Sequence, residues 1–106
     1  SGLKQFLELE GYKVDVAYNG FRAGKIFQDK NHKLVILDLV MPGLDGFDVC
    51  KAIRESESGK QTKIILLTGY LSKANRQKAK KVGVDKYQAK PVDSESLLKE
   101  IKKLIR

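Results

Sequence analysis

The sequence feature that most constrains the fold is an apolar run that ends in a carboxylate. Residues 34–37 are all apolar, Asp38 follows them, and a loop containing Pro42 and Gly43 comes soon after. A short apolar run bounded by turn residues is typical of a strand that is buried on both faces. In a parallel α/β sheet, ligands bind in the crevice at the carboxyl ends of the strands. We therefore expect Asp38 to lie in such a crevice, where a carboxylate can act as a nucleophile or a metal ligand.

A second segment repeats this arrangement, because Lys63 precedes apolar residues 64–67 and Thr68 ends the run. Apolar periodicity and turn residues predict helices and two weaker strands around these segments. The helices are predicted over residues 3–10, 21–28, 46–54, 73–82 and 94–105, and the weaker strands over 12–18 and 85–89. Strict alternation with short connections predicts right-handed crossovers and a doubly wound parallel α/β sheet with helices on both faces. Asp38, Thr68 and Lys90 should then meet at one edge.

Within these elements the sequence predicts several local contacts. Ser72 and Asp93 are suitable N-caps for the last two helices. Phe21 and Phe27 are expected to pack on the sheet from the second helix. Cys50 follows apolar positions of a helix and is interpreted as a packing residue, since a single cysteine allows no intrachain disulfide. His32, the single histidine, has no metal-spaced neighbour and is interpreted as a surface residue.

Composition limits the class of protein. A chain of 106 residues is long enough for one domain, and it contains no apolar run that could cross a bilayer and no signal-peptide pattern. We expect a cytoplasmic protein without membrane partners. The net charge of +8 arises from 21 basic and 13 acidic residues. Most of the excess falls on predicted helices, where Lys and Arg fill solvated faces, so direct nucleic-acid binding is not favoured.

The three polar residues at the predicted edge suggest a chemistry. A carboxylate can attack a phosphoryl group to form an acyl phosphate, and Mg²⁺ would offset the repulsion between the two anions. Lys90 could pair with a phosphate oxygen and Thr68 could donate a hydrogen bond to another. Taken singly, each has a structural alternative: a loop-capping acid for Asp38, a strand-end residue for Thr68, and a solvated charge for Lys90.

Together with three motifs, this trio resembles the receiver domain of two-component response regulators of the chemotaxis-regulator type, which has a flavodoxin-like fold. The motifs are the Met41-Pro42-Gly43-Leu44-Asp45-Gly46 loop, Leu67-Thr68-Gly69, and Tyr87 three residues before Lys90-Pro91. The resemblance covers nearly the whole chain. It implies a phosphoprotein that is not itself an enzyme. Its partners would be a sensor histidine kinase and a downstream effector protein or domain.

The resemblance also implies roles for individual residues. Asp38 would be the phosphoacceptor, and its carboxylate and the Val40 carbonyl would bind Mg²⁺. Thr68 would move toward the attached phosphoryl group, and Tyr87 would swing into the space that Thr68 leaves. Lys90 would pair with the phosphoryl group, and its bond to Pro91 is expected to be cis. The helix from Ser72, the strand at Tyr87 and the helix from Asp93 would form the face that changes partners.

The sequence departs from the family at its start. Receivers begin with a strand that ends in an acidic pair completing the Mg²⁺ site, whereas this sequence begins inside the following helix, and neither Glu8 nor Glu10 is placed to substitute. We expect an N-terminally incomplete receiver domain over residues 1–106, in the family strand order 2-1-3-4-5 without its first strand, with weak Mg²⁺ affinity and weak phosphorylation. Either further residues complete the sheet, or the strands pair differently, for example in a homodimer.

Three functions therefore stay open at this stage. The first is a phosphoacceptor switch centred on Asp38. The second is a receiver-like interaction module that binds without being phosphorylated. The third is a basic module that binds nucleic acid or an acidic partner through residues 73–81 and 99–103. Metal-dependent phosphorylation separates the first from the second, and a salt-dependent affinity for DNA would support the third.

Overall fold

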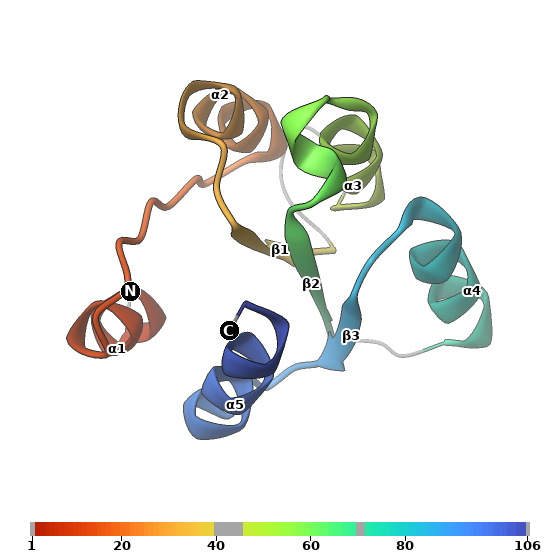
Figure 1. Cartoon of the computed structure of the whole chain (residues 1–106). Coiled ribbons are helices and arrows are strands. Elements are labelled where there is room, and N and C mark those ends of the chain that lie inside the picture. Colours follow the sequence, from red (N-terminus) through yellow and green to blue (C-terminus); the bar gives the residue numbers. More distant parts are fainter. Residues whose placement is uncertain (1, 40–45, 70–71, 106) are drawn as a thin grey trace.

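The computed structural model describes residues 2–39, 46–69 and 72–105, and it contains a parallel sheet (Figure 1). The three strands are β1 (Leu34–Asp38), β2 (Lys63–Thr68) and β3 (Lys86–Ala89), in the order β1-β2-β3. Both neighbouring pairs are parallel. The predicted parallel α/β arrangement is therefore confirmed for these strands.

Helices cover both faces of the sheet. They are α1 (Gly2–Leu9), α2 (Gly20–Lys30), α3 (Gly46–Glu55), α4 (Lys73–Val82) and α5 (Ser94–Leu104), with a short 3₁₀ helix η1 (Ser58–Lys60) before β2. Figure 1 shows α1 and α5 on one side of the strands and α2, α3 and α4 on the other. Among the helices that the structure describes, none has the length and apolar character needed to span a membrane.

The central strand β2 separates two hydrophobic clusters. Ile64 and Leu66 pack in the cluster formed with α2, α3 and α4, whereas Ile65 and Leu67 pack in the cluster formed with α1 and α5. This division follows from the alternation of side chains along a strand. Cys50 is fully buried in the first cluster, in agreement with its interpretation as a packing residue. A strand that is apolar on both faces is thus required at the centre of this fold.

The ends of α4 and α5 are fixed by the residues predicted to cap them. The Ser72 side chain accepts a hydrogen bond from the Asn75 backbone N–H, and the Asp93 side chain accepts one from Ser96. The two hydrogen bonds from Ser96 also hold the pKa of Asp93 below its usual value, because they favour the charged carboxylate. Gly83 ends α4 with a φ of 90°, a conformation that a side chain would strain.

The predicted strand over residues 12–18 is wrong. Residues 12–17 form no regular secondary structure, and Tyr18 is exposed. A strand needs a neighbour to satisfy its backbone groups, and in the described part of the chain no strand lies beside this segment. Tyr12 and Val14 nevertheless pack against the cluster on the α1 and α5 side. The alternation in sequence therefore reflects side-chain packing without strand pairing.

The prediction that Phe21 packs on the sheet is also wrong. The Phe21 side chain is 74% exposed, whereas Phe27 is 5% exposed and belongs to the core. At 3.6 residues per turn, positions six apart on a helix lie about 120° apart around its axis. Once Phe27 faces the sheet, Phe21 must therefore point toward solvent.

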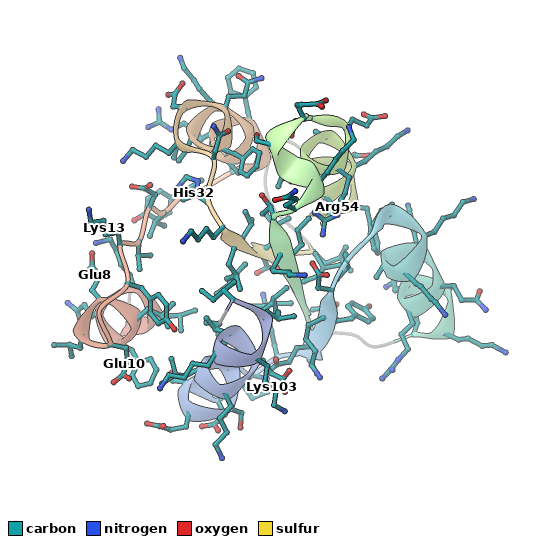
Figure 2. All side chains as sticks on the ribbon, viewed as in Figure 1. Glu8, Glu10, Lys13, His32, Arg54 and Lys103 are labelled. Atoms are coloured by element: carbon teal, nitrogen blue, oxygen red, sulfur yellow. The ribbon has the colours of Figure 1, made fainter. Side chains whose placement is uncertain are left out.

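Arg54 near the end of α3 joins three parts of the chain (Figure 2). Its Nε donates to the Gly83 carbonyl at 3.0 Å, and its Nη1 donates to the carbonyls of Gly59 and Thr62, both at 2.6 Å. Its Nη2 lies 2.9 Å from Asp85 Oδ2. The side chain is 21% exposed, so these acceptors replace most of the water that would otherwise surround the guanidinium.

We expect Arg54→Gln to lower the free energy of unfolding by about 2 to 4 kcal/mol, because three carbonyls would each lose a hydrogen bond and Asp85 would lose its ion pair. Urea denaturation measures this change as a lower midpoint at constant slope. Arg76→Gln, on the exposed surface of α4, is the matched control and should change stability by less than about 0.5 kcal/mol. Equal midpoints for the two variants would contradict the role assigned to Arg54.

Candidate functional site

The strand register brings the predicted site residues to one edge of the sheet. Asp38 is the last residue of β1 and lies opposite Leu67, one residue before the end of β2 at Thr68. Thr68 lies opposite Ala89, the residue before Lys90. Asp38, Thr68 and Lys90 therefore all stand at the carboxyl ends of adjacent parallel strands, as the sequence predicts.

Lys90 connects the other two members of this group. Its backbone N–H donates to the Thr68 carbonyl at 2.7 Å, and its Nζ forms an ion pair with Asp38 Oδ2. The Asp38 and Lys90 side chains are 36% and 40% exposed, so a ligand from solvent can reach both. The Lys90-Pro91 peptide bond is cis, as the resemblance implies. The result is an accessible carboxylate held beside a fixed cation.

Thr68 and Tyr87 share one face of the sheet. Tyr87 lies opposite Leu66, and Thr68 is two residues after Leu66 on β2. Since side chains alternate along a strand, Leu66, Thr68 and Tyr87 point to the same side. Thr68 is 3% exposed, and the partly buried Tyr87 packs against the cluster that contains Ala79 of α4. Tyr87 therefore lies on the face of the sheet that α4 covers, and Thr68 lies on the same face of the neighbouring strand.

Gly46 determines how closely α3 approaches the site. Its backbone N–H donates to the Leu39 carbonyl at 2.7 Å. A Cβ added to Gly46 would lie 2.7 Å from the Asp38 carbonyl oxygen and 2.8 Å from the Leu39 Cα. Both atoms belong to the backbone and cannot rotate away. The sequence predicts only that Gly46 begins a helix, so this requirement for glycine emerges from the structure.

The described residues supply only part of a possible Mg²⁺ site. Mg²⁺ prefers about six oxygen ligands in near-octahedral geometry. Within residues 2–39, 46–69 and 72–105, no group of three or more His, Cys, Asp or Glu side chains could hold a metal ion. Asp38 can offer a carboxylate oxygen, and Val40, the second predicted ligand, lies outside the described residues. Water or other groups would have to supply the remaining ligands.

Glu8 and His32, both named from the sequence, have side-chain partners away from Asp38. Glu8 forms an ion pair of 2.8 Å with Lys4 on the surface of α1. His32 Nε2 lies 2.7 Å from Asp15 Oδ2, and the His32 ring stacks on Phe27. The hydrogen bond with His32, followed by one from Lys30, holds the pKa of Asp15 below its usual value. His32 is therefore held beside α2 by its contacts with Phe27 and Asp15.

The comparison with known families agrees with this geometry. Residues 1–102 match the response regulator receiver domain. The chain belongs to this family. The parallel sheet, the helices on both faces and the position of Asp38 at the end of its strand are therefore those of a receiver domain from a two-component response regulator.

Two curated relatives are transcriptional regulatory proteins. ResD of Bacillus subtilis is 40% identical over 104 residues, which are 98% of this chain and 42% of ResD. SrrA of Staphylococcus aureus is 35% identical over 104 residues, again 98% of this chain and 42% of the relative. The receiver domain described here thus spans about two fifths of the length of these relatives.

Solved structures of receivers have the same fold. The chemotaxis protein CheY4 of Vibrio cholerae superimposes with a TM-score of 0.92 at 32% identity, over 97% of this chain and 86% of CheY4. A CheY-like receiver from Methanospirillum hungatei gives a TM-score of 0.89 at 32% identity, over 97% of this chain and 82% of that one. The flavodoxin-like receiver fold is therefore established for this chain.

We expect Gly46→Ala to lower the free energy of unfolding by about 1 to 3 kcal/mol, because the added methyl group overlaps the backbone that carries Asp38. Gly24→Ala in α2 is the matched control: its Cβ would meet nothing within 4 Å, and helix propensity should stabilise the variant by about 0.5 to 1 kcal/mol. Urea denaturation measures both changes, and NMR should show displaced Asp38 and Leu39 amide signals only in Gly46→Ala. A Gly46→Ala variant with parental stability and spectra would contradict the close approach.

Proposed function

We propose that this receiver domain accepts a phosphoryl group on Asp38 and that a sensor histidine kinase supplies it. The observation that carries the proposal is the accessible Asp38 carboxylate paired with Lys90 at the end of the parallel strands. Membership of the receiver family supports the same assignment. The domain itself would be the acceptor in a signalling reaction and would not be an enzyme acting on a separate substrate.

The proposed transfer is a displacement at phosphorus. An Asp38 carboxylate oxygen attacks the phosphorus atom of a phosphohistidine or of acetyl phosphate. A new O–P bond forms while the bond to the histidine nitrogen or the acetate oxygen breaks, and the leaving group keeps that electron pair. Lys90, already beside Asp38, would transfer its ion pair to a phosphoryl oxygen, and the Thr68 hydroxyl would donate to another.

We propose that Mg²⁺ binds at this site with low affinity. When bound, it would neutralise negative charge on the phosphoryl group and on Asp38. Asp38 and the Val40 carbonyl are the proposed protein ligands, and the described residues offer no cluster of acidic groups to add to them. We therefore expect phosphorylation of this chain to need more Mg²⁺ than a receiver with three carboxylates at its site.

The proposed output is a rearrangement of the face formed by α4, β3 and α5. Movement of Thr68 toward the phosphoryl group would make room for Tyr87, which lies on the same face of the sheet. A receiver domain of RstA from Klebsiella pneumoniae, 28% identical, has been solved in a state described as BeF3-activated. The relatives ResD and SrrA are transcriptional regulatory proteins, so we propose an effector that controls transcription.

A second candidate is a receiver-like module that works by binding without phosphorylation. The observation that favours it is the incomplete set of metal ligands among the described residues. The edge of β1 away from β2 also carries no strand in the described part of the sheet, so a second copy could pair there in a homodimer. Phosphorylation of the isolated chain would decide between the two candidates.

Incubation with acetyl phosphate and Mg²⁺ should add one phosphoryl group to the chain, to a low extent that rises as Mg²⁺ is increased. Intact-mass spectrometry measures the gain directly. Asp38→Asn should abolish it, because the amide is not a comparable nucleophile. Asp48→Asn is the matched control, since Asp48 is an exposed acid on α3, and it should leave the extent unchanged.

Either of two results would contradict the proposal. No mass gain at any Mg²⁺ concentration, in a sample whose circular dichroism shows a folded domain, would favour the binding-only module. A gain that persists in Asp38→Asn would place the phosphoryl group on another residue. Saturation at ordinary Mg²⁺ concentrations would overturn only the expectation of weak metal binding.

A further inference from the structure

Helix α4 carries a high density of positive charge. Five of its ten residues are Lys or Arg, and none is Asp or Glu. Arg76 and Lys80 are four residues apart, and Lys78 and Lys81 are three apart, so like charges meet on the helix surface and destabilise it. Lys73 in the first turn opposes the helix dipole, whereas Lys80 and Lys81 in the last turn complement it. Because these effects on the helix partly cancel, helix stability alone does not account for five cations without an acidic residue, which is consistent with a role in binding.

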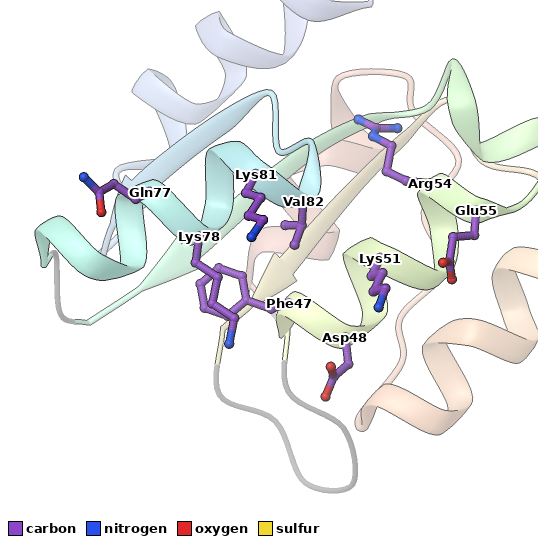
Figure 3. A pocket seen from close by; sticks show the side chains of 9 residues that line it. All are labelled: Phe47, Asp48, Lys51, Arg54, Glu55, Gln77, Lys78, Lys81 and Val82. Carbon is purple, nitrogen blue, oxygen red and sulfur yellow. The ribbon is translucent and has the colours of Figure 1, made fainter.

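A groove of about 750 Å³ lies between α3 and α4 (Figure 3). Phe47 and Val82 give it apolar walls, and Lys78 of α4 reaches across, with its Nζ 4.8 Å from the centre of the Phe47 ring. Lys51 lines the groove from α3 and Lys81 lines it from α4. The groove therefore combines an apolar surface with cations from both helices.

These cations have no carboxylate partners in the described ranges of the chain. None of Lys51, Lys78 and Lys81 forms an ion pair within residues 2–39, 46–69 and 72–105. Arg54, which also lines the groove, is used internally by its bonds to backbone carbonyls and Asp85. Three ammonium groups are thus available to an external ligand of negative charge.

We propose that this groove binds an acidic peptide segment of a partner protein, with an apolar residue between its carboxylates. The carboxylates would pair with Lys51, Lys78 and Lys81, and the apolar residue would pack against Val82 and the edge of Phe47, whose side chain is 6% exposed. Asp48 and Glu55 also line the groove, and they would repel the unbroken row of phosphates in a nucleic acid. A peptide can place neutral residues beside them. The proposal does not depend on phosphoryl transfer to Asp38.

The probe for this site is a short fluorescein-labelled peptide in which glutamates alternate with glycines around a central leucine, so that neutral residues can lie beside Asp48 and Glu55, and its binding is measured by fluorescence anisotropy. Lys78→Glu/Lys81→Glu should weaken binding by about tenfold or more, because two attractions become repulsions. Lys25→Glu/Lys102→Glu changes the net charge equally at exposed positions outside the groove, and it should weaken binding by less than about threefold. A probe with serine in place of leucine should bind more weakly to the unaltered protein.

NMR titration of the unaltered protein tests the location without any substitution. The amide signals of Asp48, Lys51, Lys78 and Lys81 should shift together as the peptide is added, while those of α1 stay in place. Several results would overturn the proposal: equal losses in the two double variants, no preference for leucine over serine, shifts outside the groove, or tighter binding of duplex DNA than of the peptide. The Asp38→Asn variant should bind the peptide as the parent does, so this test can fail independently of phosphorylation.

Discussion

The parallel pairing of β2 with both of its neighbours is the constraint on which the rest of the structure depends. β2 presents Ile64 and Leu66 to one layer of helices and Ile65 and Leu67 to the other, so both hydrophobic clusters form around this single strand. The same register sets Asp38 beside Leu67 and Thr68 beside Ala89. A slip of one residue would exchange the faces of the strand and separate the site residues, and so the core and the site are specified together.

Lys90 shows how the site depends on this sheet. Its backbone N–H continues the pairing of β3 with β2 through the Thr68 carbonyl, while its ammonium group reaches Asp38 at the end of β1. One residue thus joins all three strands at the edge where the proposed chemistry occurs. Phe47, which lines the groove between α3 and α4, directly follows Gly46, so a partner bound in the groove would be close to the backbone that carries Asp38.

The sequence predicted the elements whose signals are local. Apolar runs of four residues identified β1 and β2, and the polar residue at the end of each run identified the site residues Asp38 and Thr68. Ser72 and Asp93 were correctly expected to be caps. The rest depended on distant contacts. Arg54 has acceptors five to 31 residues away along the chain. A strand over residues 12–18 would need a neighbouring strand, and none lies beside it in the described part of the chain. The exposure of Phe21 and the need for glycine at position 46 likewise depend on how α2 and α3 pack, which the local sequence does not specify.

The most direct test of the central claim, that Asp38, Thr68, Lys90 and Tyr87 act as one phosphoryl-responsive unit, is an NMR titration with beryllofluoride and Mg²⁺. Beryllofluoride forms a phosphoryl-like adduct on a carboxylate without the hydrolysis that limits an acyl phosphate. We predict that the amide signals of Thr68, Tyr87 and Lys90 change together in the parent and remain unchanged in Asp38→Asn. Absence of any change in a folded parent, or the same changes in Asp38→Asn, would contradict the account.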